Sequence, residues 1–190
     1  NFRALASNLA AGGVSQGAST LNQQYVKNYL LLVAAQTDEE RAAATEQSIP
    51  RKLREIRLAA EMDKELSKDQ ILTNYLNLVP FGNHSYGIEA AAQTYFGVPA
   101  ADLSVPQSAL LAGMVQSSEY LNPYTNPEGA TDRRNQVLQS MADNGYLSQA
   151  DADRFAGEGL GVLESPNLVA NGCIGAGDRG FFCDYVLQYL

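Results

Sequence analysis

The apolar residues of this chain recur every three or four positions in several stretches, which is the spacing of a helix with one buried face. In the stretch RKLREIRLAAEMDKEL, for example, Leu53, Ile56, Ala60 and Leu66 fall near one side of such a helix. No stretch of the sequence shows sustained alternation of apolar and polar residues, the pattern that indicates strands. The pattern therefore predicts an all-α fold.

Most of the periodic stretches begin at a residue whose side chain can accept hydrogen bonds from the free amides of a helical first turn. The expected helix starts are Ser19 or Thr20 (running to about Ala35), Ser48 before Pro50, Ser67 with Gln70 (through Leu78), Ser104 with Gln107, Asn126 with Pro127, and Ser148 with Asp151. Gly145 can end the fifth of these helices in a left-handed conformation. Beyond about Glu164 the periodicity stops, which predicts a linker or an extension.

Charge is unevenly distributed along the 190 residues, whose formal net charge is −8. Residues 1–60 hold seven basic and five acidic side chains, a net +2, whereas residues 61–190 hold six and sixteen, a net −10. An acidic chain is not built to wrap nucleic acid, so we expect no nucleic-acid partner. A local basic cluster in such a chain favours a small anionic ligand.

The longest apolar run, YLLLVAA at residues 29–35, is much shorter than the roughly 18–20 residues of a membrane span. The sequence begins without Met and already inside a periodic segment, NFRALASNLAAGG. We therefore expect it to be a fragment of a longer protein.

Two short motifs carry little weight. The segment GAGDRG at residues 175–180 matches G-x-G-x-x-G, but a dinucleotide site requires that motif between a strand and a helix. His84 is the only histidine, which excludes a histidine-based metal cluster and leaves a Ser-His-Asp triad only this one residue to use. We expect His84 to lie in the turn FGNHSYG.

The informative region lies between residues 17 and 57. A small-residue loop, GAST, leads into a helix start, where free amides with the hydroxyls of Ser19 and Thr20 can hold phosphate oxygens. Gln23 and Lys27 then share a helix face. From spacing alone, ordinary helix capping and a polar helix surface are the better explanation of this segment.

The second half of this region is RKLRE, residues 51–55, in which two guanidiniums flank the carboxylate of Glu55. Guanidinium groups bind phosphates through two parallel hydrogen bonds, and Lys52 adds a point charge. The alternative is an exposed ion pair between residues four apart, worth a few tenths of a kcal/mol.

These segments together resemble the glycosyltransferase (transglycosylase) domain of bifunctional class A penicillin-binding proteins, a lysozyme-like peptidoglycan glycosyltransferase family. GASTLNQQYVKNYLL is similar to its G-x-S-T-x-x-Q-Q-x-V-K-N signature, and RKLREIRLAAEMDKELSKDQILTNYLN to its R-K-x-x-E helix and continuation. FGNHSYGIEAAAQTYFG and SALLAGMVQSSEYLNPYTNPEGATDRRNQVL follow in the family's order. The resemblance covers about residues 1–155.

The resemblance implies a lysozyme-like helical lobe with a small membrane-facing jaw at about residues 29–48. It implies polymerisation of lipid II into β-1,4-linked glycan strands, with inversion and release of undecaprenyl pyrophosphate. The implied partners are lipid II, the growing strand, the membrane surface and a transpeptidase domain of the same parent chain. The implied location is the extracytoplasmic face of the bacterial membrane, anchored by an upstream segment. No cofactor is required, although Mg²⁺ or Mn²⁺ can join at the pyrophosphate.

Carried over position by position, the resemblance makes Glu55 the second catalytic glutamate. It makes Lys27, Arg51 and Lys52 the cations that bind the pyrophosphate. The residues expected to bind substrate are Ser19, Thr20, Gln23, Gln24, Lys27, Arg51 and Lys52. The family's first motif, a Glu-Asp pair before a Phe and a His, would lie upstream of Asn1, and no acidic residue precedes Asp38. We therefore expect an N-terminally truncated domain that is inactive by itself.

The expected domain boundaries are a glycosyltransferase domain at residues 1–164 and a linker at 165–190, directed towards a transpeptidase domain whose S-x-x-K and K-T-G motifs the sequence lacks. Cys173 and Cys183 are expected to form a disulfide in an extracytoplasmic setting, with two reduced thiols as the alternative. Two other functions remain: a lysozyme-like lytic hydrolase, which needs no pyrophosphate cluster, and a non-catalytic helical binding module.

Overall fold

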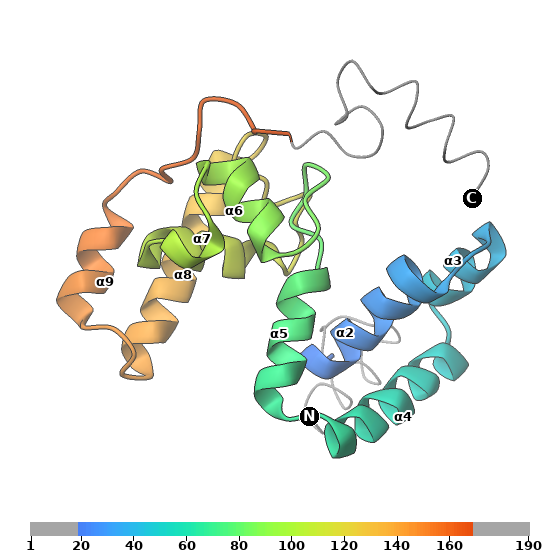
Figure 1. Ribbon diagram of the computed structural model, residues 1–190. Coiled ribbons are helices and arrows are strands. Elements are labelled where there is room, and N and C mark those ends of the chain that lie inside the picture. Colours follow the sequence, from blue (N-terminus) through green and yellow to red (C-terminus); the bar gives the residue numbers. More distant parts are fainter. Residues whose placement is uncertain (1–18, 169–190) are drawn as a thin grey trace, which may run out of the picture. The chain divides into compact units, whose positions relative to one another are not determined.

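The computed structural model describes residues 19–168 of the chain (Figure 1). Every regular element in this range is helical, and the only strand-like pairing there is an isolated antiparallel bridge between Pro80 and Tyr86. The predicted all-α fold is therefore confirmed across the described range. The motif at residues 175–180, the pair Cys173 and Cys183, and most of the expected linker lie outside it. The chain divides into two compact units, Asn1–Val79 and Pro80–Leu190, and each is described by itself.

The first unit contains five helical elements in the described range. They are α2 (Leu21–Tyr29), the π-helical turn η1 (Leu30–Ala34), α3 (Asp38–Thr45), α4 (Ile49–Glu65) and α5 (Lys68–Leu78). The predicted starts are confirmed, because the side chains of Thr20, Ser48 and Ser67 each accept a hydrogen bond from a backbone amide of the following first turn. Ser67 and Gln70 form the expected reciprocal capping box.

Helix α3 was not among the helices predicted from periodicity. It is short and has no buried residue, so it lacks the apolar stripe on which the prediction relied. Its signal is at its start, where Thr37 and Glu40 form a capping box and three acidic residues occupy the first turn. Acidic side chains near a helix N-terminus are stabilised by the helix dipole.

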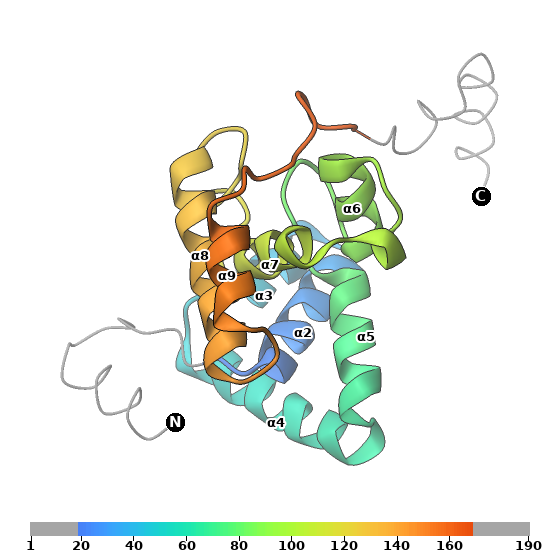
Figure 2. The same cartoon turned by 90° about the vertical axis from the view of Figure 1, so that its left-hand side faces the viewer.

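The core of the first unit lies where α2 packs against both α4 and α5, as the two ribbon views agree (Figure 2). Val26 of α2, Ala59 of α4 and Ile71 of α5 are each less than 10% exposed. Burying one aliphatic side chain of this size stabilises a fold by about 1.5–3 kcal/mol. This small apolar contact fixes α2 against α4, the two helices that carry the predicted site.

The second unit begins at Pro80 and contains five helical elements in the described range. They are α6 (Ile88–Phe96), η2 (Ala100–Asp102), α7 (Val105–Met114), α8 (Pro127–Asp143) and α9 (Gln149–Ala156). The starts predicted at Ser104, Asn126 and Ser148 are confirmed. Gly145 follows α8 with a φ of +76°, so the expected left-handed residue is also present.

Helices α7, α8 and α9 form the main packed layer of the second unit. Leu110, Leu111 and Leu138 are essentially inaccessible to solvent, and Ala152 of α9 covers α8. Gly113 lets α7 approach α8 closely, since a Cβ there would lie 2.9 Å from Arg133 Cγ. This layer supports the loops that lead into and out of α6.

In the described range, no helix is both long and apolar enough to cross a bilayer.

Arg134 is a charged residue at the centre of this second unit. Its side chain is fully buried, and its guanidinium donates to the carbonyl oxygens of Ala156 (3.1 Å), Glu158 (2.9 Å) and Gly159 (3.0 Å). These carbonyls belong to the end of α9 and the residues after it, where a helix leaves acceptors unpaired. Burial lowers the pKa of Arg134, and the charge of Glu158 opposes this shift. Arg134 therefore ties α8 to the chain that follows α9.

Replacing Arg134 with Ala should destabilise the protein by about 3–5 kcal/mol, because three carbonyls lose their donor and a large void opens. Urea unfolding followed by circular dichroism measures the change. Arg154→Ala is the matched control: this arginine is 59% exposed and its ion pairs lie at the surface, so the loss should stay below about 1 kcal/mol. Equal losses in both variants would contradict the role given to Arg134.

Candidate functional site

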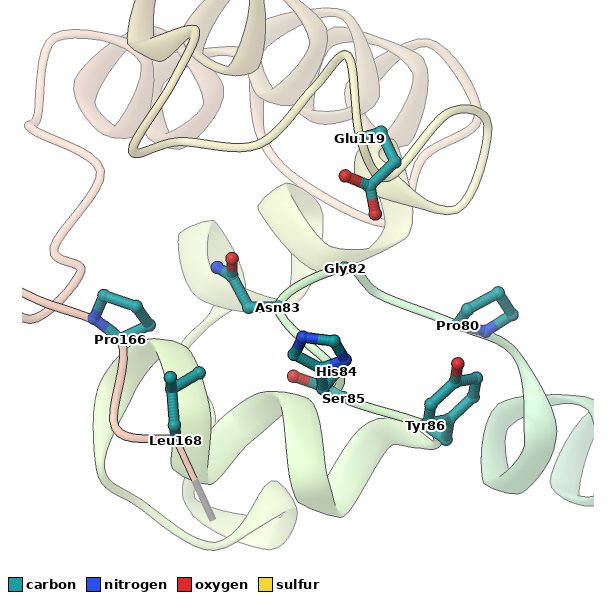
Figure 3. A pocket seen from close by; sticks show the side chains of 9 residues that line it. All are labelled: Pro80, Gly82, Asn83, His84, Ser85, Tyr86, Glu119, Pro166 and Leu168. Atoms are coloured by element: carbon teal, nitrogen blue, oxygen red, sulfur yellow. The ribbon is translucent and has the colours of Figure 1, made fainter. Parts of the chain in front are cut away.

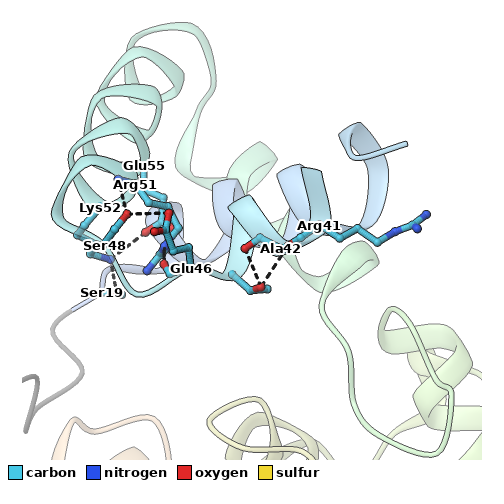
Figure 4. A network of polar contacts seen from close by, with 9 residues as sticks. Ser19, Arg41, Ala42, Glu46, Ser48, Arg51, Lys52 and Glu55 are labelled. Carbon is cyan, nitrogen blue, oxygen red and sulfur yellow. Dashed lines mark hydrogen bonds and ion pairs between the residues drawn. The ribbon is translucent and has the colours of Figure 1, made fainter. Parts of the chain in front are cut away.

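The predicted carboxylate lies on α4 beneath two cations. Helix α4 begins after Ser48, so Arg51, Lys52 and Glu55 occupy its first turns on one face. Arg51 pairs with Glu55 Oε1, and Lys52 Nζ lies 3.1 Å from Oε2 (Figure 4). The Glu55 side chain is 2% exposed, whereas those of Arg51 and Lys52 are 19% and 36% exposed. The cations thus lie between the carboxylate and solvent, which makes this more than an exposed surface pair.

The structure brings the two predicted segments together through Lys52. Its ammonium group donates to Ser19 Oγ over 2.6 Å while it also contacts Glu55. Ser19 lies two residues before the start of α2, and α2 packs on α4. Residues 33 positions apart in sequence therefore form one polar cluster of Ser19, Arg51, Lys52 and Glu55. We call this group the Lys52 cluster.

A third contact orients Arg51. Its Nε donates to the backbone oxygen of Glu46, the residue at the end of α3, while its terminal nitrogen reaches Glu55. The Ser48 hydroxyl donates to the Glu46 carboxylate over 3.2 Å in the same turn (Figure 4). The short link between α3 and α4 thus fixes the plane of the guanidinium.

Gln24 of α2 contacts both α5 and Ser19, a member of the Lys52 cluster. Its side-chain oxygen accepts a hydrogen bond from Tyr75 OH of α5 at 3.1 Å, and its Nε2 reaches Ser19 O in a long contact of 3.5 Å. Burial raises the pKa of Tyr75, which keeps the phenol protonated and able to donate. Tyr75 was not predicted as a site residue, because nothing in the sequence distinguishes it from a core tyrosine at helical spacing.

The remaining predicted residues lie around the start of α2. Thr20 Oγ1 accepts from the Gln23 amide at 3.4 Å, so this hydroxyl caps the helix. Gln23 is half-buried, and Lys27 is exposed with no ion pair to any residue in the range 19–168. Asn22, missed by sequence reasoning, donates to Asp63 and so joins α2 to α4 a second time.

The arrangement is suited to binding an anion. Two cations share the Glu55 carboxylate in the Lys52 cluster, and Lys27 adds a further positive charge on α2. A guanidinium has five N–H donors, of which Arg51 uses one on Glu46 and one on Glu55. Donors therefore remain for a phosphate oxygen.

Comparison with known sequences decides the family. A sequence profile described as transglycosylase matches residues 1–142 of the 190. The chain belongs to the transglycosylase family. Within residues 1–142 lie all the predicted substrate-binding positions and Glu55.

Individual relatives agree with this assignment. This transglycosylase chain is similar to penicillin-binding protein 1A of Mycolicibacterium smegmatis, with 45% identity over 152 residues, covering 80% of this chain and 18% of that protein. It is 40% identical over 164 residues to penicillin-binding protein 1A of Streptococcus oralis, covering 84% and 24%. The chain thus spans between about a sixth and a quarter of the length of these relatives.

Among solved structures, the transglycosylase chain matches penicillin-binding protein 1A from Haemophilus influenzae with a TM-score of 0.46 at 25% identity. The match covers 78% of this chain and 18% of that one. The assignment to the family rests on the sequence match.

Changing Tyr75 to Phe should cost about 0.5–1.5 kcal/mol of stability, because the partly buried side-chain oxygen of Gln24 loses its donor. Amide hydrogen exchange at Gln23 and Gln24, whose N–H groups donate to Thr20, should quicken in the same variant, since Gln24 no longer holds the start of α2. Tyr29→Phe serves as the control, because that tyrosine is 45% exposed and its change should leave stability and exchange unaltered. Identical exchange in the two variants would show that Tyr75 does not support the Lys52 cluster.

Proposed function

We propose that this chain is the peptidoglycan glycosyltransferase domain of a bifunctional penicillin-binding protein. Its reaction is the polymerisation of lipid II into β-1,4-linked glycan strands with release of undecaprenyl pyrophosphate. The observation that carries the proposal is the Lys52 cluster, a buried glutamate covered by two cations, in a chain of the transglycosylase family. The names of its relatives support the link to penicillin-binding proteins.

The Lys52 cluster holds the pyrophosphate of the donor. Arg51 binds phosphate oxygens through the N–H groups not used on Glu46 and Glu55, and Lys52 adds a point charge. Glu55 holds both cations in the orientation that faces the pyrophosphate, since it contacts each of them. Preorganised donors of this kind stabilise charge as it develops on a leaving group.

The chemical step is a single displacement at the anomeric carbon of the donor sugar. The acceptor hydroxyl oxygen forms the new C–O bond while the bond to the pyrophosphate oxygen breaks, and the pyrophosphate leaves with the electron pair. Attack opposite the leaving group inverts the anomeric configuration. The proton of the acceptor hydroxyl goes to a carboxylate base, which the family resemblance assigns to a glutamate upstream of Asn1.

In this proposal a divalent metal joins the reaction at the pyrophosphate. The part of the chain at residues 19–168 holds no group of three or more His, Cys, Asp or Glu side chains that could bind a metal ion. Glu55 is already paired with two cations. Mg²⁺ is often held by one or two carboxylates together with substrate phosphates, so any Mg²⁺ or Mn²⁺ here depends on the ligand.

The proposed jaw at residues 29–48 lies against the outer face of the bacterial membrane. Tyr29, Leu32 and Val33 support this placement, because their side chains are 45%, 38% and 52% exposed and follow one another along α2 and η1. Apolar side chains presented by one helical segment favour an interfacial position. The same parent chain is proposed to carry the anchor and the transpeptidase domain.

A lytic hydrolase is the less favoured alternative. Such an enzyme needs a protonated carboxyl as general acid, usually in apolar surroundings. Glu55 instead contacts an arginine and a lysine. The cluster therefore suits a leaving group with negative charge better than glycoside hydrolysis by water.

Changing Arg51 to Ala should weaken binding of an isoprenyl pyrophosphate by about tenfold to a hundredfold, the roughly 1.5–3 kcal/mol of a charge-assisted hydrogen bond. Calorimetric titration with farnesyl pyrophosphate at low ionic strength measures this. Arg57→Ala is the control on the same helix, since Arg57 is 81% exposed and pairs with Glu61 at the surface. The site is misassigned if the two variants bind the probe equally well.

The 190-residue chain alone should show no detectable polymerisation of lipid II, because a general base typically contributes about 10²–10⁴-fold and no acidic residue precedes Asp38. A longer protein that includes the upstream segment of its gene should polymerise it. Glu55→Gln in that longer protein should abolish most of the activity, whereas Glu61→Gln, an exposed glutamate of the same helix, should not. Glycan products separated on a gel give the measurement, and equal rates for short and long proteins would refute the assigned base.

A further inference from the structure

A hollow of about 440 Å³ lies beside the loop before α6 in the second unit (Figure 3). Its polar side chains do not converge on one point, since Glu119 and Tyr86 lie apart at its edges and the Ser85 hydroxyl is buried. The amide of Asn83 is already hydrogen-bonded at both its nitrogen and its oxygen. The hollow therefore selects no ligand, whereas the exposed side of α4 in the first unit does select a partner.

An apolar stripe runs along the first half of α4. Ile49, Leu53 and Ile56 are 78%, 61% and 43% exposed. Residues spaced by four and then three positions lie on one side of a helix. The buried side of α4 is a different one, since it holds Glu55 and Ala59. The apolar periodicity of this sequence thus includes a face that the described part of the protein leaves in solvent.

The same half of α4 is basic. Residues 49–60 contain four basic side chains and one acidic one, a net +3, whereas residues 61–65 contain one and three, a net −2. Arg54 and Arg57 of the basic half are exposed, and its one carboxylate, that of Glu55, is buried. In a chain with a net charge of −8, positive charge and exposed apolar side chains therefore coincide on one half of one helix.

Cations border the stripe on both sides. Lys52 lies three positions after Ile49 and four before Ile56, so it is a neighbour of both on the helix surface. Arg57 lies four positions after Leu53 and neighbours it in the same way. The hydrocarbon stems of such side chains can cover apolar surface while their charged ends reach polar groups. Exposed apolar side chains between cations are typical of helices that lie in the interface of an anionic membrane.

We propose that residues 49–60 of α4 bind the surface of a lipid bilayer that carries anionic headgroups. The three apolar side chains of the stripe enter the boundary between headgroups and acyl chains, and Arg54 and Arg57 contact the headgroup phosphates. This inference rests on the proposed function, which places a membrane contact at residues 29–48. It adds a second contact, on another helix, and a preference for the charge of the lipid.

Lys52 connects this surface to the Lys52 cluster. Its side chain borders the stripe and also contacts Glu55 and Ser19. A bilayer that receives the stripe therefore brings its headgroups close to the cations of the cluster. The pyrophosphate of an isoprenyl lipid lies at the same depth as those headgroups, so the helix positions the anion site where its ligand is anchored.

Vesicles of two compositions test the proposal on the 190-residue protein. Phosphatidylcholine vesicles are neutral, and mixed vesicles of phosphatidylcholine and phosphatidylglycerol are anionic. Sedimentation with vesicles should show at least about tenfold tighter binding to the anionic ones, because two exposed arginines face their surface. Raising the salt concentration should remove most of this difference. Equal binding to the two kinds of vesicle, or binding to neither, overturns the proposal.

Leu53→Ser tests the apolar stripe. It should weaken binding to anionic vesicles about tenfold, since the buried apolar area of such a helix contributes to its membrane affinity. Tyr146→Ser is the matched control, because Tyr146 is 82% exposed in the second unit and its change should leave binding unaltered. Unchanged binding in Leu53→Ser overturns the proposal. A lower urea midpoint of this variant would show that protein covers the stripe, and would overturn it equally.

The double variant Arg54→Gln with Arg57→Gln tests the charge. Each basic side chain near an anionic surface contributes about fivefold to affinity, so the double variant should bind anionic vesicles about tenfold to thirtyfold more weakly. Its binding to neutral vesicles should not change. Arg154→Gln is the control in the second unit, where the arginine is 59% exposed. A double variant that keeps the full preference for anionic vesicles would overturn the role given to the two arginines.

The outcomes separate this inference from the proposed function. Polymerisation of lipid II by the longer protein, without a preference for anionic vesicles, would refute the α4 contact alone. A preference for anionic vesicles that depends on Leu53, without polymerisation by the longer protein, would refute the glycosyltransferase assignment and leave the membrane contact standing.

Discussion

The carboxylate of Glu55 is buried in the first unit, and removing a charged group from water costs several kcal/mol unless partners replace the lost solvation. Arg51 and Lys52 supply those partners from the same helix, three and four residues away. Lys52 also donates to Ser19, so the pairing that satisfies Glu55 fixes the start of α2. This one requirement therefore joins the start of α2, the first turns of α4 and the link after α3 at the site. A site built in this way is assembled before any ligand arrives.

The helix starts could be predicted because they depend on local chemistry. Ser48, Ser67, Asn126 and Ser148 each bond to amides within their own first turn, so their roles follow from a few neighbouring residues. The face shared by Arg51, Lys52 and Glu55 follows from helical spacing in the same way. The meeting of this face with Ser19 did not follow from spacing, and it was expected only because of the family resemblance.

The contacts that escaped prediction join residues far apart in sequence. Tyr75 and Gln24 are 51 positions apart, and Arg134 reaches carbonyls 22 to 25 positions away. A tyrosine or an arginine at helical spacing is the same in sequence whether it faces solvent or a buried acceptor. Helix α3 was missed because its body has no buried face, so the sequence lacks the apolar periodicity there. Only the capping box at its start marks it. Periodicity thus finds elements that pack, and caps find elements that do not.

The chain after α9 is fastened to the second unit at two places that differ in kind. Arg134 donates to carbonyl oxygens within residues 156–159. Later in the chain, the backbone N–H groups of Leu163 and Asn167 donate to the carbonyl oxygens of Tyr95 and Thr94, respectively, at the end of α6. Tension applied to the chain beyond Leu168 would first load the two backbone bonds on α6. The guanidinium would be loaded only after they yield. The two backbone hydrogen bonds to α6 would therefore break first under load, while the packed layer of α7, α8 and α9 stays intact.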